Sequence, residues 1–363
     1  MQPPVVDVLA RPAAPERLNG RSTTLLVSGF LAVVIGAVIA LVPAPYAIYA
    51  PGPVTNVLGV VGSKRLISIS GAPTYPAKGT LDMTTVSVYG GPGRTLRLPQ
   101  VLQAWLSRSQ AGLPQDQVFP PGETATQVST QNAAEMSDSQ QSATAAGLRE
   151  TGLVVPETVT IAEVSRTAPA AGVLRAGDVI TGVNGLTVVD SSAVRAAVSA
   201  LKPGAPVTVT VRRDGRGVQE RTTTTKQDGR TILGVGLAPT FRFPVDVTFA
   251  TRDVGGPSAG MMFALGIYDL LTPGELTGGV QVAGTGTIDA AGVVGPIGGI
   301  AQKLVGARSA GARWFLAPAA NCGEVVGNVP DGLRVVRTAS LHESRVAAQA
   351  TAAGRGAALP TCR

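Results

Sequence analysis

A single uncharged stretch near the start of the chain limits where the rest can fold. Residues 24–42 (TLLVSGFLAVVIGAVIALV) are 19 residues long and contain no charged side chain. A helix rises about 1.5 Å per residue, so this stretch can cross a hydrocarbon core of about 30 Å. Arg11, Arg17 and Arg21 precede it, and the next charged residue is Lys64. The positive-inside rule therefore predicts a cytoplasmic N-terminus and an extracytoplasmic body.

A cleaved signal peptide is the alternative to this anchor. The apolar region of a signal peptide is about 7–15 residues long and ends at a small-x-small site. Residues 43–53 (PAPYAIYAPGP) contain no convincing A-x-A site. We expect an uncleaved single-pass anchor in the cell membrane. If the segment is cleaved, the protein is secreted, and both outcomes place the body outside the cytoplasm.

The composition excludes several classes of site. The chain has 363 residues, 44% of them hydrophobic, which is enough for two or three domains with real cores. It contains one histidine, His342, and two cysteines, too few for a zinc site of the usual Cys/His types. The net charge is +7, but the basic residues are scattered and not interleaved with aromatics. We therefore expect no metal, no cofactor and no nucleic-acid partner.

The extracytoplasmic location affects how the two cysteines are interpreted. Cys322 and Cys362 are 40 positions apart, and an oxidising compartment favours a disulfide between them. Such a bond would hold the C-terminal tail against its domain. The alternative is two unpaired thiols.

The first half of the body contains recognisable elements. Thr- and Val-rich residues 78–90 predict a strand, and residues 98–106 and 131–150 predict helices. Residues 107–128 are rich in Gly, Pro, Ser and Gln with little periodicity, which predicts a mobile loop. The pattern then changes to short strands around one helix. The predicted strands are 159–164, 179–183 and 207–212. The predicted helix is 190–201, with Asp190 as its N-cap.

Residues 168–185 (APAAGVLRAGDVITGVNG) resemble the signature of bacterial PDZ domains. The resemblance implies a small β-barrel with a groove in which an extended peptide pairs with an edge strand. A loop of the Gly-Leu-Gly type normally opens this groove. The nearest match is Gly152-Leu153-Val154, which lacks the second glycine. These three residues are our candidate peptide site, and a PDZ domain that only positions or gates its neighbour is the alternative.

Two turns in the last third of the chain carry the candidate chemistry. The first is 255–260 (GGPSAG), followed by an apolar helical run, and the second is 292–303 (GVVGPIGGIAQK). Taken alone, Ser258 is an ordinary helix cap and Lys303 an ordinary solvated charge. Together the turns resemble the protease domain of the Lon family, whose serine lies in a G-P-S-A-G turn and whose lysine follows a P-I-G-G turn.

This resemblance covers about residues 227–345 and implies a Ser258–Lys303 catalytic dyad. Thr285 falls where the family places a threonine that helps to orient the lysine. A neutral lysine can activate a serine when burial lowers its pKa. The Ser258 amide, with one from Gly255 or Gly256, would stabilise the oxyanion. The anchor, the PDZ signature and their order resemble the membrane-anchored, PDZ-containing bacterial branch of Lon-like proteases.

These inferences combine into one expected molecule. The sequence contains no G-x-x-x-x-G-K-[ST] loop, so we expect an ATP-independent serine endopeptidase that acts on extracytoplasmic proteins or peptides. The alternative function is a non-catalytic PDZ scaffold or chaperone-like adaptor. The resemblance also implies homo-oligomers, hexamers being common among Lon-type domains. The expected fold class is α+β, with a cytoplasmic segment (1–23), a transmembrane helix (24–42), an N-terminal α/β segment (43–150), a PDZ-like barrel (151–226) and a Lon-type protease domain (227–363).

Overall fold

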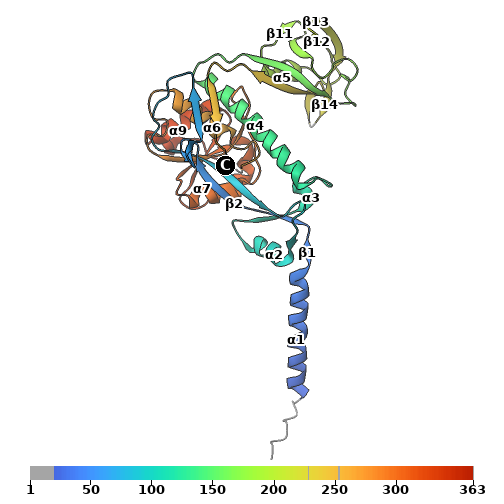
Figure 1. Cartoon of the computed structure of the whole chain (residues 1–363), viewed down its shortest axis with the longest axis vertical. Coiled ribbons are helices and arrows are strands. Elements are labelled where there is room, and N and C mark those ends of the chain that lie inside the picture. Colours follow the sequence, from blue (N-terminus) through green and yellow to red (C-terminus); the bar gives the residue numbers. More distant parts are fainter. Residues whose placement is uncertain (1–19, 228, 252–253, 363) are drawn as a thin grey trace, which may run out of the picture.

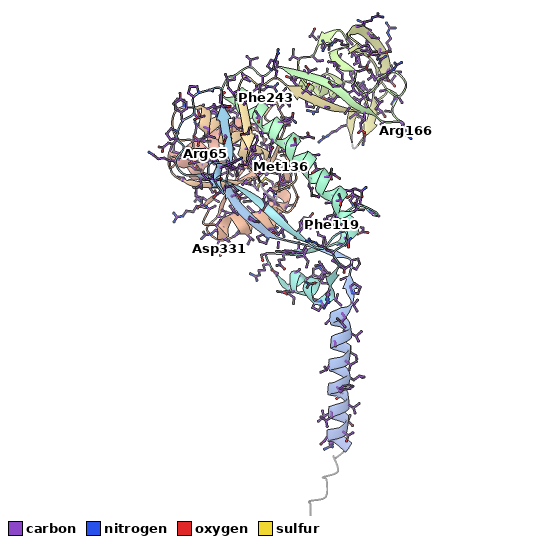
Figure 2. The ribbon with its side chains drawn as sticks, in the orientation of Figure 1. Arg65, Phe119, Met136, Arg166, Phe243 and Asp331 are labelled. Carbon is purple, nitrogen blue, oxygen red and sulfur yellow. A yellow bond between two sulfur atoms is a disulfide. The ribbon has the colours of Figure 1, made fainter. Side chains whose placement is uncertain are left out.

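The computed structural model describes residues 20–227, 229–251 and 254–362, so most of the expected cytoplasmic segment lies outside the described residues. Figure 1 shows a protruding helix, a central α/β body and a smaller β-rich unit beside it. The protruding helix is α1 (Gly20–Leu41), which buries no residue and has a mean hydropathy of 2.6. Within the described chain, α1 alone is long and apolar enough to cross a membrane, and a signal sequence would share these properties.

The body is built on a six-stranded mixed sheet. Strands from both halves of the chain form it, because β6 pairs with β18 in parallel, from Gln281 opposite Thr80 to Gly284 opposite Met83. Strands β22, β21, β18 and β6 are parallel to one another, whereas β2 is antiparallel to both of its neighbours, β6 and β8. The order is β22 (Arg334–Thr338), β21 (Trp314–Pro318), β18 (Gln281–Gly284), β6 (Thr80–Tyr89), β2 (Tyr46–Asn56) and β8 (Ala111–Pro114).

Helices cover both faces of this sheet. Alternate strand residues point to opposite faces, so Val282 packs in one buried cluster and Ala283 in the other. One face carries α4 (Ala125–Glu150), α6 (Gly260–Leu271) and α9 (Leu341–Ala352), and the other carries α7 (Ile300–Ser309). The crossing of α4 and α6 is tight, because a Cβ at Gly147 would lie 2.9 Å from the carbonyl oxygen of Ala264.

Short elements complete the body. Cys322 and Cys362 are joined by a disulfide, which holds the tail beside α8. The small hairpins and pairs are β1 (Pro43–Ala44) with β7 (Leu96–Arg97), β3 (Val60–Val61) with β4 (Lys64–Arg65), β5 (Ile67–Ser70) with β17 (Asp246–Phe249), and β19 (Thr287–Ile288) with β20 (Val294–Gly295). The short helices are α2 (Leu98–Leu106), α3 (Gln115–Val118), η1 (Ala319–Asn321), α8 (Cys322–Val325) and η2 (Gly356–Ala358).

The prediction of a mobile loop over residues 107–128 was wrong. This stretch contains β8, α3 and the start of α4. The long helix begins six residues before the predicted position because Thr124 and Gln127 form a reciprocal capping box, in which the Thr124 hydroxyl accepts from the Gln127 amide. The expected helix over 98–106 and the expected strand over 78–90 are confirmed as α2 and β6.

The smaller unit has its own sheet and its own buried cluster, which includes Ile161, Leu174 and Val209. Helix α5 (Ser191–Ser199) packs on the sheet, and the Asp190 side chain caps it by accepting from the Ala193 amide at 2.7 Å. The sheet order is β13 (Arg216–Thr223), β12 (Pro206–Arg213), β10 (Val179–Val183), β9 (Glu157–Val164) and β16 (Val235–Phe241). Strand β11 (Leu186–Thr187) pairs with β10, and β14 (Thr225–Gln227) forms a hairpin with β15 (Arg230–Ile232).

Candidate active site

The serine turn leads directly into the buried helix α6. Gly256 has a φ of +80°, which favours glycine, and Ser258 lies two residues before the helix begins at Gly260. The carbonyl oxygen of Ser258 accepts two hydrogen bonds, from the Gly286 amide at 2.8 Å and from the Thr285 hydroxyl at 2.9 Å. The link between β18 and β19 therefore fixes the backbone of the serine.

The lysine turn is fixed from the opposite side of the sheet. Helix α7 starts after Gly299, whose φ is +68°, and a Cβ there would lie 2.7 Å from a methyl of Val86. Asn321 holds the same turn by accepting from the Ile297 amide at 2.9 Å and donating to the Ile297 carbonyl at 2.8 Å. This support places Lys303 on the first turn of α7, directed toward Ser258.

The Lys303 amine lies within hydrogen-bond distance of both hydroxyl groups of the site. Its Nζ lies 2.8 Å from Ser258 Oγ and 2.9 Å from Thr285 Oγ1. Only 2% of Lys303 is exposed, and Thr285 is fully buried. Burial penalises the charged amine and lowers the pKa of Lys303 from 10.5 to about 7. The amine therefore carries a free lone pair in a large fraction of molecules near neutral pH, as a general base requires.

Helix α4 supports the serine turn, although no local sequence pattern predicts this contact. Ser139 donates from its hydroxyl to the Pro257 carbonyl at 2.9 Å. The Gly256 amide donates to the Asn132 carbonyl at 3.0 Å, and a Cβ at Gly255 would lie 2.8 Å from the Cβ of Asn132. The Gly256 N–H, one of the amides we expected to face an oxyanion, is therefore engaged by α4 in this structure.

The smaller unit contains a groove between α5 and the edge strand β16. Its volume is about 690 Å³, and its walls are mainly apolar with two arginines. The residues that line it are Val194, Arg195, Val198, Ser199, Gly229, Arg230, Thr231, Ile232, Leu233, Val235 and Leu237. A free strand edge beside a helix is the arrangement into which an extended peptide can add.

The residues that we proposed for peptide binding lie elsewhere. Gly152, Leu153 and Val154 belong to the connector between α4 and β9, and Leu153 and Val154 line a different cavity of about 600 Å³. The glycine-rich segment beside the α5–β16 groove is Leu233-Gly234-Val235-Gly236, which leads into β16 at the end of the unit and not at its start. A search for a second-glycine motif beyond residue 226 would have found it.

The described residues offer no metal centre. No group of three or more His, Cys, Asp or Glu side chains comes together in the described ranges 20–227, 229–251 and 254–362. The one histidine, His342, has an exposed side chain, and its ring nitrogen lies 3.1 Å from a carboxylate oxygen of Glu150. Lys303 is thus the candidate base that contacts Ser258.

Comparison with known proteins adds two domain matches. Residues 129–224 match the PDZ domain family, and residues 249–346 match the Lon protease (S16) C-terminal proteolytic domain. Lon protease 2 of Syntrophobacter fumaroxidans is 38% identical over 88 residues, which are 24% of this chain and 10% of that protein. A Lon protease of Phenylobacterium zucineum is 44% identical over 66 residues, 18% of this chain and 8% of that protein. The chain therefore spans a tenth or less of the length of these relatives.

Solved structures are similar to about a fifth of the chain. The PDZ domain of an SdrC-like protein from Listeria monocytogenes is 27% identical, covering 22% of this chain and 85% of that one, with a TM-score of 0.21. A protein from Geobacillus thermodenitrificans is 28% identical, covering 22% of this chain and 94% of that one, also with a TM-score of 0.21.

Proposed function

We propose that this chain, a Lon-like serine endopeptidase with a PDZ domain, cleaves extracytoplasmic proteins or peptides through a Ser258–Lys303 dyad while anchored by α1. One observation carries the proposal: the Lys303 amine is buried and lies 2.8 Å from Ser258 Oγ. A nucleophile within hydrogen-bond reach of a base whose pKa is lowered to about 7 can be activated at neutral pH.

The proposed reaction uses one base for two half-reactions. Neutral Lys303 accepts the hydroxyl proton as Ser258 Oγ attacks the scissile carbonyl, and the resulting ammonium then protonates the leaving amine. This gives an acyl-enzyme on Ser258 and a neutral lysine again. Lys303 next accepts a proton from water as the water attacks the ester, and returns it to Ser258. Thr285 keeps the amine aimed at Oγ throughout, because it contacts both the amine and the serine backbone.

The substrates that we propose are flexible segments. The sequence carries no phosphate-binding G-x-x-x-x-G-K-[ST] loop, so nothing in it would couple ATP hydrolysis to unfolding. An endopeptidase of this kind acts on chains that are already extended. The apolar α1 supports the proposed anchoring, and the Cys322–Cys362 disulfide supports a body on the extracytoplasmic side of the membrane, where thiols are oxidised. Ring-like homo-oligomers are part of the same proposal.

The test of the dyad is single-turnover cleavage of casein by the full chain in lipid nanodiscs. We expect Ser258→Ala and Lys303→Ala to remove cleavage, and the wild-type rate to rise with pH through a midpoint near the lowered pKa of about 7. Ser63→Ala, in the β3–β4 turn, and Lys202→Ala, in the PDZ domain, are the matched controls and should cleave normally, because both residues are exposed and lie outside the candidate sites. Cleavage that survives in Ser258→Ala, or is absent from the wild type, would favour the non-catalytic PDZ scaffold.

For the PDZ domain we propose that the α5–β16 groove takes a free peptide C-terminus and so positions substrate. Its apolar walls would hold the last side chain, and Arg195 and Arg230 offer positive charge to a carboxylate. Peptide binding to the full chain, followed by fluorescence anisotropy, tests this site. Ile232→Glu should weaken binding at least tenfold, whereas Val154→Glu, in the connector cavity, should not. The opposite result would restore the connector as the peptide site.

A further inference from the structure

We propose that α2 is an interfacial helix, which lies in the headgroup region of the membrane that α1 spans and gives the body a second contact with lipid. This inference rests on the proposed anchoring by α1. It concerns a surface that the proteolytic mechanism does not use.

The fold places α2 at the end of the proposed span. The Leu98 amide donates to the Val42 carbonyl at 3.3 Å, immediately after α1. Strand β1 pairs with β7, with Pro43 opposite Arg97, so the residues that follow the span and those that precede α2 are joined as well. Figure 1 shows α2 beside the end of α1, at the near edge of the body. If α1 crosses the bilayer, α2 therefore begins where the headgroups lie.

The two long sides of α2 are both apolar, but only one of them faces protein. Val101 and Ala104 are fully buried against the body. Leu102, Trp105 and Leu106, spaced three and four residues apart on another side, are 43%, 52% and 88% exposed. Such a stripe is poorly suited to water and well suited to the boundary between headgroups and acyl chains.

Trp105 has the arrangement of an interfacial anchor. Its indole N–H donates to the Gly112 carbonyl at 3.2 Å, and its ring meets Tyr46 edge-on at 5.3 Å. The polar end of the side chain is thus satisfied by protein, while about half of the side chain is exposed. Tryptophan and tyrosine are enriched at this depth because one part of each ring is apolar and the other is polar.

The charges around α2 suit an anionic membrane surface. Residues 83–115 contain no acidic residue. The charged residues in this range are Arg94, Arg97 and Arg108. They flank the helix at both ends. Basic residues beside an apolar stripe add electrostatic attraction to anionic lipids. Position, apolar stripe and charge agree on lipid as the partner of this face.

The experiment uses the full chain with Trp314→Phe, so that Trp105 is the sole tryptophan. The chain is reconstituted into vesicles of phosphatidylcholine and phosphatidylglycerol that contain lipids brominated near the headgroup or near the chain end. We expect blue-shifted emission and at least twofold stronger quenching by the shallow bromines. Trp105→Phe, which leaves Trp314 in the body, is the matched control and should escape quenching.

Three results would overturn the inference. Emission typical of water with no bromine quenching would show that α2 stands clear of lipid. Quenching in Leu106→Asp that equals the wild type would show that the stripe is not the contact. Blue-shifted emission that is not quenched and that changes with the number of protein molecules per vesicle would show that the stripe packs against a second copy of the chain.

The anchoring itself is tested separately. Flotation of the same vesicles after carbonate washing reports whether α1 holds the chain in the bilayer, and casein cleavage reports the dyad. A chain that floats and cleaves with an unquenched Trp105 contradicts only this inference. A chain that does not float with the vesicles contradicts the proposed anchoring by α1, on which the inference about α2 rests.

Discussion

At Lys303, catalysis and stability make opposite demands. A buried ammonium costs free energy, so the folded chain holds its proton less tightly than the unfolded chain, with a pKa of about 7 against 10.5. Below about pH 7 both states are protonated, and the folded state bears the cost of the buried charge. Between those two values the unfolded state binds more protons, and stability rises with pH.

This sign gives a measurable prediction. Lys303→Met keeps the apolar stem and removes the charge, so we expect it to be more stable than the wild type at pH 6. The difference should shrink as pH rises toward 10, by an amount on the order of a few kcal/mol. Urea unfolding of the two chains across this range measures it. Lys202→Met, at an exposed position, is the control, and its free energy of unfolding should follow the same pH dependence as that of the wild type. The same pH dependence for Lys303→Met and the wild type would contradict a buried amine with a lowered pKa.

Thr285 offers a second prediction at this scale. Its hydroxyl donates to the Ser258 carbonyl and accepts from Lys303. Thr285→Val keeps the shape but removes one hydrogen bond from the Ser258 carbonyl and one from the Lys303 amine, at a total cost of about 1–3 kcal/mol, which is roughly fivefold to 150-fold in rate. We expect kcat to fall, the pH midpoint of the rate to move, and Thr285→Ser to restore both. A purely structural role would lower the melting temperature without moving the midpoint.

The pairing of Ser258 with Lys303 was accessible from the sequence because two rigid, glycine-rich turns carry it. Each turn has a local pattern, and the structure places the two side chains 2.8 Å apart. Asn132 and Ser139 were not accessible in this way. They reach the serine turn across 118 positions or more, through the packing of α4 on α6, and neither residue type is unusual in a helix.

Among the elements, α4 supports the serine turn from outside the matched proteolytic region. Ser139 is 5% exposed and donates to the Pro257 carbonyl. Removing this bond should cost about 1 kcal/mol, so Ser139→Ala should lower kcat roughly fivefold with KM unchanged. Thr144→Ala is the matched control, because Thr144 is equally buried on α4 but bonds only to the Gln140 carbonyl of its own helix. Equal effects of the two changes on kcat would show that α4 acts through general stability alone.

The C-terminal tail supplies a prediction about a covalent tie. The Cys322–Cys362 disulfide closes a separation of 40 residues, and the Arg337 amide donates to the Pro360 carbonyl beside it. In the chain-entropy account, losing such a bond costs about 3–4 kcal/mol. We therefore expect the double change of Cys322 and Cys362 to Ala to lower the melting temperature by several degrees. A reducing agent should lower the wild type to the same value and leave the double variant unchanged.

The sheet of the body shows which part of the fold the sequence did not reveal. The mixed α+β class and the separate PDZ-like unit were predictable from periodicity and motif, and both are confirmed. The parallel pairing of β6 with β18 was not predicted. Both strands have ordinary apolar patterns, and nothing local to residues 80–89 indicates a partner 201 positions away. A long-range register of this kind is specified by which side chains the finished sheet buries on each face, and that depends on the complete fold.

At the scale of the whole molecule, the body and the PDZ domain must be coupled if the groove is to present substrate to the dyad. Arg149, at the end of α4, is the main polar link. It donates to the Ala290 carbonyl at 2.8 Å in the body and contacts Glu157 at 3.1 Å at the start of β9. Glu157 is almost fully buried and also accepts from the Ser191 amide at the start of α5. One guanidinium thus touches the body, the connector and the PDZ domain.

Arg149→Met should uncouple the two parts. It leaves the buried Glu157 carboxylate without its cationic partner, and breaking such a pair is destabilising. We expect small-angle scattering to report a larger radius of gyration, and proteases to cut the connector near Leu153 at least tenfold faster. Arg149→Lys keeps the charge but loses the forked donors, so an intermediate result is expected.

Arg195→Met is the matched control, because the exposed Arg195–Asp289 pair also joins the parts but only at 3.8 Å. If Arg195→Met uncouples the two parts and Arg149→Met does not, the link between the body and the PDZ domain is the Arg195–Asp289 pair on the surface of α5.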